Sequence, residues 1–429
     1  MEQQHGKHAL NTCEQTDIEV LGKSIKIPRS KRVIPNRVVY QPMELNSADA
    51  SGAPAKRDLA VLADQFRGQP GINWLQATAV MPSGISTRNQ WVLTEKNLPA
   101  FKQIAKLHRE LNPKGLLLIQ LTHSGWLALD DPVTPYLSGD CPNARLLTDA
   151  EMREIQKRNI EAYQLAEAAG FHGAELAKEC HGYLFSKMLN RENKSRPGWS
   201  YGGPSLEERL GYYAETMRLA QKALSHPETF VNVMRISMLH GMSDEFGTLP
   251  GSADEDPSLQ DAYTLVRVAL ELGTQIINVS SGIGAQSLHL MVPTSEHPER
   301  VLDHFRWTAA VKEWVGNNAI VVGSAYSYLR DGNNKVSDGL LHEKSLWHLA
   351  AENIRHGQTD MIGLARQVLA DPLVAAKLLG GDLAHISWCT GCGKCIGLLG
   401  NQLLAGCEIY DPFAQGVAAS ARRMGKLKK

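Results

Sequence analysis

The stretch GLLLIQL, from Gly115 to Leu121, is a short apolar run with one polar residue, Gln120, near its end. A strand this short and this uniformly apolar is typical of a parallel sheet buried on both faces. Similar stretches lie at residues 37–42, 72–77, 173–177, 230–237, 275–281, 319–324 and 360–365. The sequence therefore predicts eight strands of one buried parallel sheet.

Amphipathic helical patterns separate these strands. In the clearest one, Thr148 and Glu151 form a capping box at the start and Gly170 stands at the end. A second helix is predicted over residues 205–225. Eight strand–helix units in a chain of 429 residues predict an α/β fold, a (β/α)8 TIM barrel with a C-terminal cysteine-rich extension.

The predicted barrel covers residues 1–386, a cysteine-rich segment follows at 387–415, and a basic tail at 416–429. Lys plus Arg and Asp plus Glu both number 45, which argues against a nucleic-acid partner and for a small-molecule ligand. No apolar run reaches the length of a membrane span, and the N-terminus lacks a secretory signal. We therefore expect a cytoplasmic protein, in which disulfides are rare.

Four of the seven cysteines lie in CTGCGKCIGLLGNQLLAGC, at Cys389, Cys392, Cys395 and Cys407. Zinc sites usually pair two C-x2-C units, whereas three thiolates from one turn plus a remote fourth are common around a [4Fe–4S] cluster. The spacing therefore favours a [4Fe–4S] cluster over zinc, and either over a metal-free remnant.

Five motifs occur in order at barrel positions: PNRVVYQPM from Pro35, LTHSG from Leu121, CHGYL from Cys180, YGGPSLEERL from Tyr201 and GLARQVLADP from Gly363. This set resembles the Old Yellow Enzyme family of FMN-dependent oxidoreductases. More narrowly, it resembles the iron–sulfur branch that includes 2,4-dienoyl-CoA reductase and trimethylamine dehydrogenase, whose cysteine spacing differs from this one by single residues. The resemblance covers residues 36–412.

A flavin needs hydrogen-bonding groups along its pyrimidine edge and a cation near N1. Gln120 can supply the first and Arg235 the second, at the ends of the third and fifth strands. The resemblance implies that Pro42, Met43 and Ala77 contact the isoalloxazine ring.

The flavin phosphate needs backbone N–H groups at a glycine turn and a cation, which barrels usually supply after the last two strands. Gly323 and Ser324 follow the seventh strand, and Gly363 and Arg366 lie at the eighth. These four residues are the predicted phosphate site.

The segment KECHGYL follows the fourth strand, where the family pattern is His-x-x-His/Asn-x-Tyr. The resemblance implies that Lys178 and His181 bind a substrate carbonyl oxygen and that Tyr183 donates a proton. Lys178 departs from the family histidine; the alternative is that it forms an ion pair with Glu179 or Glu175.

Together these residues predict an FMN- and [4Fe–4S]-dependent oxidoreductase that reduces the C=C bond of an α,β-unsaturated carbonyl or enoyl-CoA-type substrate. The longer relatives carry a C-terminal FAD and NAD(P)H region, which this chain is expected to lack. The expected electron donor is a ferredoxin, a flavoprotein or NAD(P)H itself, and relatives are often homo-oligomers. The polar segment 239–257 is either a lid or a solvated insertion.

The main alternative is an amine dehydrogenase or demethylase that passes electrons from FMN through the cluster to a partner protein. An aromatic cage for a cationic substrate would favour it, and Trp126, Tyr136 and Trp199 are its candidate members. A non-enzymatic electron-transfer subunit and a zinc-stabilised barrel are further alternatives.

Overall fold

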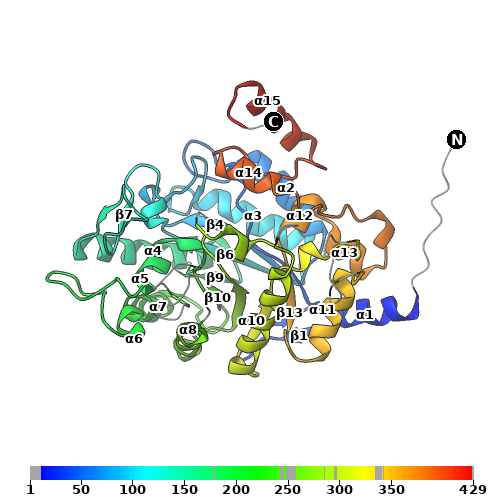
Figure 1. The fold of residues 1–429 in the computed structure, drawn as a ribbon, viewed down its shortest axis with the longest axis horizontal. Coiled ribbons are helices and arrows are strands. Elements are labelled where there is room, and N and C mark those ends of the chain that lie inside the picture. The colour runs from blue at the N-terminus through cyan, green and yellow to red at the C-terminus, as the bar shows by residue number, and fades with distance from the viewer. Residues whose placement is uncertain are drawn as a thin grey trace.

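The computed structural model describes residues 11–176, 179–241, 246–247, 258–284, 286–293, 297–333, 341 and 343–427, and only the backbone of His181. Eight parallel strands form a closed ring (Figure 1). They are β3 (Val38–Tyr40), β4 (Ile72–Ala79), β6 (Leu116–Thr122), β9 (Gly173–Glu175), β10 (Val231–Ser237), β11 (Ile276–Ser280), β12 (Ile320–Gly323) and β13 (Met361–Leu364). The ring closes because β3 pairs in parallel with both β4 and β13. The predicted (β/α)8 barrel is confirmed, and each strand overlaps one of the eight predicted stretches.

Helices surround this ring (Figure 1). The principal ones are α2 (Lys56–Arg67), α3 (Leu98–Leu111), α4 (Asp149–Ala169), α7 (Gly211–Ala223), α8 (Leu259–Glu271), α10 (Arg300–Val315), α11 (Leu346–Arg355) and α12 (Arg366–Ala370). An N-terminal helix, α1 (Thr12–Gly22), packs on α11. The remaining elements before α13 are short: β1 (Ile25–Lys26), β2 (Val33–Ile34), β5 (Trp91–Val92), β7 (Val133–Thr134), β8 (Arg145–Leu146), α5 (Leu184–Leu189), α6 (Leu206–Arg209), α9 (Leu288–Met291) and the 3-10 turns η1 (Pro82–Gly84), η2 (Gly125–Leu127), η3 (Cys180–Gly182) and η4 (Tyr326–Tyr328).

Local sequence signals account for the ends of α4. The Thr148 hydroxyl accepts from the backbone N–H of Glu151, whose carboxylate accepts from the backbone N–H of Thr148. Gly170 ends the helix with a left-handed φ of 93°, which glycine adopts without steric cost. Both predicted helix ends are confirmed.

The predicted single helix over residues 205–225 is wrong: the chain forms α6 and then α7. Ser205 caps α6, which is only four residues long. The buried guanidinium of Arg209 donates to the carbonyl oxygens of Leu189, Gly203 and Pro204, so its side chain ties this turn to the preceding loop. Tertiary contacts therefore interrupt a helix that the local pattern continues.

The barrel interior changes from apolar to polar along its axis. Residues at the beginnings of the strands, such as Ile72, Leu116 and Ile276, belong to one buried apolar cluster. Towards the carboxyl ends, Gln120 and Arg235 are buried polar side chains. A site for chemistry therefore lies at the carboxyl ends, as in other barrels of this type. Within the described ranges, every helix is too short or too polar to cross a membrane.

After the barrel, the chain continues through α13 (Val374–Leu379), the turn η5 (Leu383–His385), α14 (Lys394–Gly400) and α15 (Pro412–Arg423). This segment returns to the loop after β3, where the Ala405 N–H donates to the Leu45 carbonyl at 2.8 Å. Helices α14 and α15 share a small apolar cluster and lie together on one side of the barrel (Figure 1). Helix α15 continues past residue 416, where the basic tail was predicted to begin.

Candidate active site

A cavity of about 470 Å³ opens at the carboxyl ends of the barrel strands. Its lining includes eight of the predicted flavin and catalytic residues: Pro42, Met43, Ala77, Gln120, Tyr183, Arg235, Ser324 and Arg366. A volume of this size is typical of small-molecule and cofactor sites. The structure therefore brings residues from seven strands or their following loops into one site.

Gln120 is held by a neighbour that the sequence did not indicate. Its Nε2 donates to Glu175 Oε2 at 2.6 Å, and both side chains are fully buried. Gln120 is on β6 and Glu175 ends the adjacent strand β9. This contact fixes the orientation of the Gln120 amide at the cavity wall.

Two predicted glycines lie behind the wall rather than on it. A Cβ on Gly363 would lie 2.3 Å from Gln41 Nε2, so glycine leaves room for that side chain. Gln41 Nε2 in turn donates to Ser324 Oγ at 2.7 Å. The backbone N–H of Gly323 donates to Thr359 Oγ1 at 3.2 Å. Of the predicted phosphate residues, Ser324 and Arg366 therefore line the cavity, whereas Gly323 and Gly363 support it.

Two buried arginines carry N–H groups that no described residue accepts. Arg235 Nη2 donates to Ser280 Oγ at 3.2 Å, but its Nε has no partner among the described residues. Arg366 Nη2 donates to the Pro293 carbonyl at 3.0 Å, and its Nη1 likewise lacks a partner there. Buried donors normally have partners, so two such groups in one cavity fit an anionic ligand.

Tyr183 is buried at the same cavity, and its hydroxyl lies 2.9 Å from Ser86 Oγ. Burial raises the pKa of Tyr183 well above its usual range, and the nearby charge of Glu44 raises it further. The phenol therefore keeps its proton at neutral pH. Ser86 is held by Gln90, whose Oε1 accepts from the Ser86 N–H at 2.7 Å. Sequence reasoning missed Ser86, which lies 97 positions from Tyr183.

The side chains predicted to bind the substrate carbonyl oxygen are not described by the structure. Lys178 lies outside the described residues, as does the side chain of His181. Most of the predicted lid, residues 239–257, also lies outside them. Glu179, a suggested partner of Lys178, is buried. Its Oε2 accepts from the Ser237 N–H at 2.5 Å, and its Oε1 lies 3.1 Å from His240 Nε2.

The candidate aromatic cage does not line the cavity. Lys187 Nζ lies 5.3 Å from the centre of the Trp126 ring and 6.0 Å from the centre of the Tyr136 ring. It also forms an ion pair with Asp140 Oδ2 at 2.5 Å. Trp199 packs against the guanidinium of Arg196 at 4.3 Å. Cations of the chain itself therefore contact the rings that were candidates for binding a cationic substrate.

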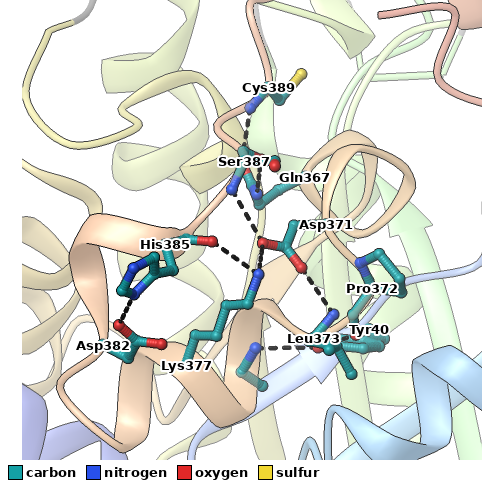
Figure 2. Close-up of polar contacts among 11 residues, drawn as sticks. Tyr40, Gln367, Asp371, Pro372, Leu373, Lys377, Asp382, His385, Ser387 and Cys389 are labelled. Atoms are coloured by element: carbon teal, nitrogen blue, oxygen red, sulfur yellow. Dashed lines mark hydrogen bonds and ion pairs between the residues drawn. The ribbon is translucent and has the colours of Figure 1, made fainter. Parts of the chain in front are cut away.

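The first cysteine of the motif is fixed by the last barrel helix (Figure 2). Gln367 Oε1 accepts from the Cys389 N–H at 2.9 Å, and its Nε2 donates to the Ser387 carbonyl at 3.0 Å. Asp371 accepts from the Ser387 N–H at 3.0 Å and from Lys377 Nζ at 2.7 Å. These contacts attach the start of the cysteine segment to α12 and α13.

All seven cysteines are described and none forms a disulfide. Burial raises the pKa of Cys395 to about 11, and the thiols of Cys389, Cys392 and Cys407 act in the same direction, so the four groups lie within electrostatic range of one another. Thiolates gathered in one loop repel one another, and a bound metal keeps such thiols deprotonated.

A separate group of potential metal ligands lies at Cys13, Asp17 and His348, whose ligand atoms are within 4.8 Å of one another. There Asp17 already accepts from Arg355 Nη1 at 2.6 Å and lies 2.9 Å from His348 Nδ1, which links α1 to α11.

The cysteine segment also forms part of the cavity wall. Ile396, Leu399, Gly400 and Gln402 line it. Gln402 Nε2 donates to the Ser86 carbonyl at 3.2 Å, which joins this wall to the loop that contacts Tyr183. The sequence did not indicate either contact.

Residues 23–381 match the family described as NADH:flavin oxidoreductase / NADH oxidase. The chain belongs to this family. The predicted class of flavin-dependent oxidoreductase is thereby confirmed at the level of the family, and the match supports FMN as the flavin. Four cavity residues, from Ile396 to Gln402, lie beyond the matched region.

Among curated relatives, the chain is 25% identical over 415 residues to the NADH oxidase of Thermoanaerobacter brockii, covering 92% of this chain and 57% of that protein. Among solved structures, it is similar to 2-naphthoyl-CoA reductase in complex with 2-naphthoyl-CoA, with a TM-score of 0.76 and 20% identity. The match covers 93% of this chain and 58% of that chain. It is also similar to histamine dehydrogenase from Rhizobium sp. 4-9, with a TM-score of 0.71 and 19% identity. This match covers 93% of this chain and 53% of that chain. The chain thus spans little more than half the length of these proteins.

Proposed function

We propose that this member of the NADH:flavin oxidoreductase family binds FMN in the barrel cavity and reduces the C=C bond of an α,β-unsaturated carbonyl or enoyl-CoA-type compound. The observation that carries the proposal is the convergence of Gln120, Arg235, Arg366 and Tyr183 on one cavity. The structural likeness to 2-naphthoyl-CoA reductase is consistent with an acyl-CoA-type substrate.

The cavity residues fit FMN in charge and in hydrogen bonding. Arg235 Nε and Arg366 Nη1 have no acceptor among the described residues, which leaves the first for the electron-rich edge of the ring and the second for the phosphate. The Gln120 amide, oriented by Glu175, would bind the pyrimidine edge. Bound FMN supplies hydride chemistry at N5. The apolar residues Pro42, Met43 and Ala77 would contact the ring and exclude water.

Tyr183 is the proposed proton donor. Its raised pKa keeps the phenol protonated, and Ser86 holds the phenol oxygen at 2.9 Å. General acids placed in this way contribute about 10²–10⁴-fold to rate. Lys178 and His181 would bind the substrate carbonyl oxygen, as the family motif implies.

Cys389, Cys392, Cys395 and Cys407 are the proposed ligands of a [4Fe–4S] cluster, which supplies single-electron transfer. Two observations support this: the four thiols are free, and they lie close enough to influence one another electrostatically. The cluster would receive electrons from a ferredoxin or flavoprotein partner. Alternatively, NAD(P)H would reduce the flavin directly. Amine oxidation is less well supported because Trp126 and Tyr136 contact Lys187 instead of the cavity.

Absorption spectra and metal assays on anaerobically purified protein test both cofactors. Flavin bands together with about four irons and matching sulfide per chain are expected. Flavin with zinc would refute the cluster and leave a plain flavin reductase. Protein without affinity for added FMN would refute the proposed activity.

A further inference from the structure

Arg366 lies at the boundary between the cavity and the cysteine segment. It is the first residue of α12, it is 7% exposed, and it lines the cavity with Ser324. The next residue, Gln367, accepts from the Cys389 N–H (Figure 2). On the other side of the boundary, Ile396, which follows Cys395, lines the same cavity.

A second contact joins the two regions through η4. A Cβ on Gly391, between the first two cysteines, would lie 3.5 Å from the ring carbon Cε2 of Tyr328. The phenol of Tyr328 is buried, and its hydroxyl has no partner among the described residues. The loop of cysteines therefore packs directly on the segment that follows the Ser324 turn.

Arg366 is a buried cation, and its Nη1 has no acceptor within the described part of the chain. Its field reaches η4: burial raises the pKa of Tyr328, and the charge of Arg366 opposes that rise. A buried charge is screened far less by salt and water than an exposed one.

We propose that Arg366 is a positioning residue for both cofactors: it holds the flavin phosphate, and its charge raises the reduction potential of the cluster. The inference rests on the proposed function. Reducing a thiolate-ligated cluster adds negative charge, which a nearby buried cation stabilises. A phosphate bound to the same guanidinium would offset part of that effect, so flavin occupancy would lower the cluster potential.

The test is an anaerobic redox titration of the cluster, followed by electron paramagnetic resonance, with excess FMN to compensate for weaker flavin binding. Arg366→Gln should lower the midpoint potential, whereas Arg366→Lys, which keeps the charge, should lie closer to wild type. Lys394→Gln is the matched control: it is adjacent to Cys395 in sequence, but it is 44% exposed and lies 3.6 Å from Glu408. The cluster potential of Lys394→Gln should differ from wild type by less than that of Arg366→Gln.

A second arm needs no variant. Wild-type protein freed of FMN should show a higher cluster potential than the FMN-loaded protein. An unchanged potential in Arg366→Gln at normal iron content, or no effect of FMN on wild type, would overturn this inference and leave the proposed function intact. Wild-type protein that holds no iron would overturn both the proposed cluster and the inference.

Discussion

The hydroxyl groups of Ser86 and Tyr183 lie 2.9 Å apart at the wall of the barrel cavity, although the residues are 97 positions apart. Ser86 is also held from the other side, because Gln402 in the cysteine segment donates to its carbonyl oxygen. Ser86 therefore contacts both the proposed proton donor and the segment that carries the proposed cluster ligands.

Tyr183→Phe should slow substrate reduction by about 10²–10⁴-fold, because the hydroxyl that delivers the proton is lost. Reduction of the flavin by its electron donor should keep its rate, since Tyr183 takes no part in it. Stopped-flow absorption separates the two half-reactions. Tyr213→Phe, a buried tyrosine on α7 outside the cavity, is the control. Equal slowing of both half-reactions would contradict the role of Tyr183.

Ser86→Ala should slow the same half-reaction by about 2–10-fold, the equivalent of one neutral hydrogen bond. Ser86→Thr retains the hydroxyl and should restore most of the rate. The substrate KM should change little, because Ser86 acts through Tyr183. An effect of Ser86→Ala on flavin binding alone would assign the residue to the cofactor instead.

Gln367→Ala should weaken retention of the cluster by about 10–100-fold, the usual effect of losing an outer contact that orients a metal ligand. The variant loses the contacts that hold both Ser387 and Cys389. Iron release to a chelator measures the effect. Gln415→Ala, at an exposed position of α15, is a control: its side-chain amide donates to the Ile409 carbonyl. Retention of iron equal to wild type would show that the Gln367 contact is not needed.

Gly363→Ala should destabilise the protein by about 1–3 kcal/mol, because the new Cβ would collide with the Gln41 amide 2.3 Å away. The displaced Gln41 would also lose its hydrogen bond to Ser324. Gly397→Ala is the matched control, since no atom of the described residues outside its own helix backbone lies within 4 Å of its Cβ position. Denaturant unfolding of both variants measures the difference, and equal stability would refute this account of Gly363.

Stability should fall as pH is lowered from about 6.5 towards 5. Burial lowers the pKa of His108 to about 3 and that of His304 to about 4, so both stay neutral in the folded protein. The unfolded chain binds protons at these residues below about pH 6.5, which favours unfolding by up to about 1.4 kcal/mol per pH unit for each histidine. Denaturant unfolding at a series of pH values measures the slope. His304→Gln should reduce it, whereas exposed His356→Gln should not.

The sequence alone predicted the barrel and eight of the residues that line the cavity. Short apolar runs such as 115–121 predict buried strands because burial on both faces is a local requirement of a parallel sheet. Once the strands are known, the carboxyl-end rule places Gln120 and Arg235 in one site without further information. Capping of α4 at Thr148 is equally local, since its partners lie three residues apart.

Tertiary structure decided the contacts that no local pattern encodes. Glu175 orients Gln120 across 55 positions, and Gln402 reaches Ser86 across 316, so neither pair has a sequence signal. The same reason explains why Lys187, rather than a ligand, lies beside Trp126. Strand identity follows from the burial pattern of neighbouring residues, whereas the partner of each buried polar group depends on how distant segments are brought together when the barrel closes.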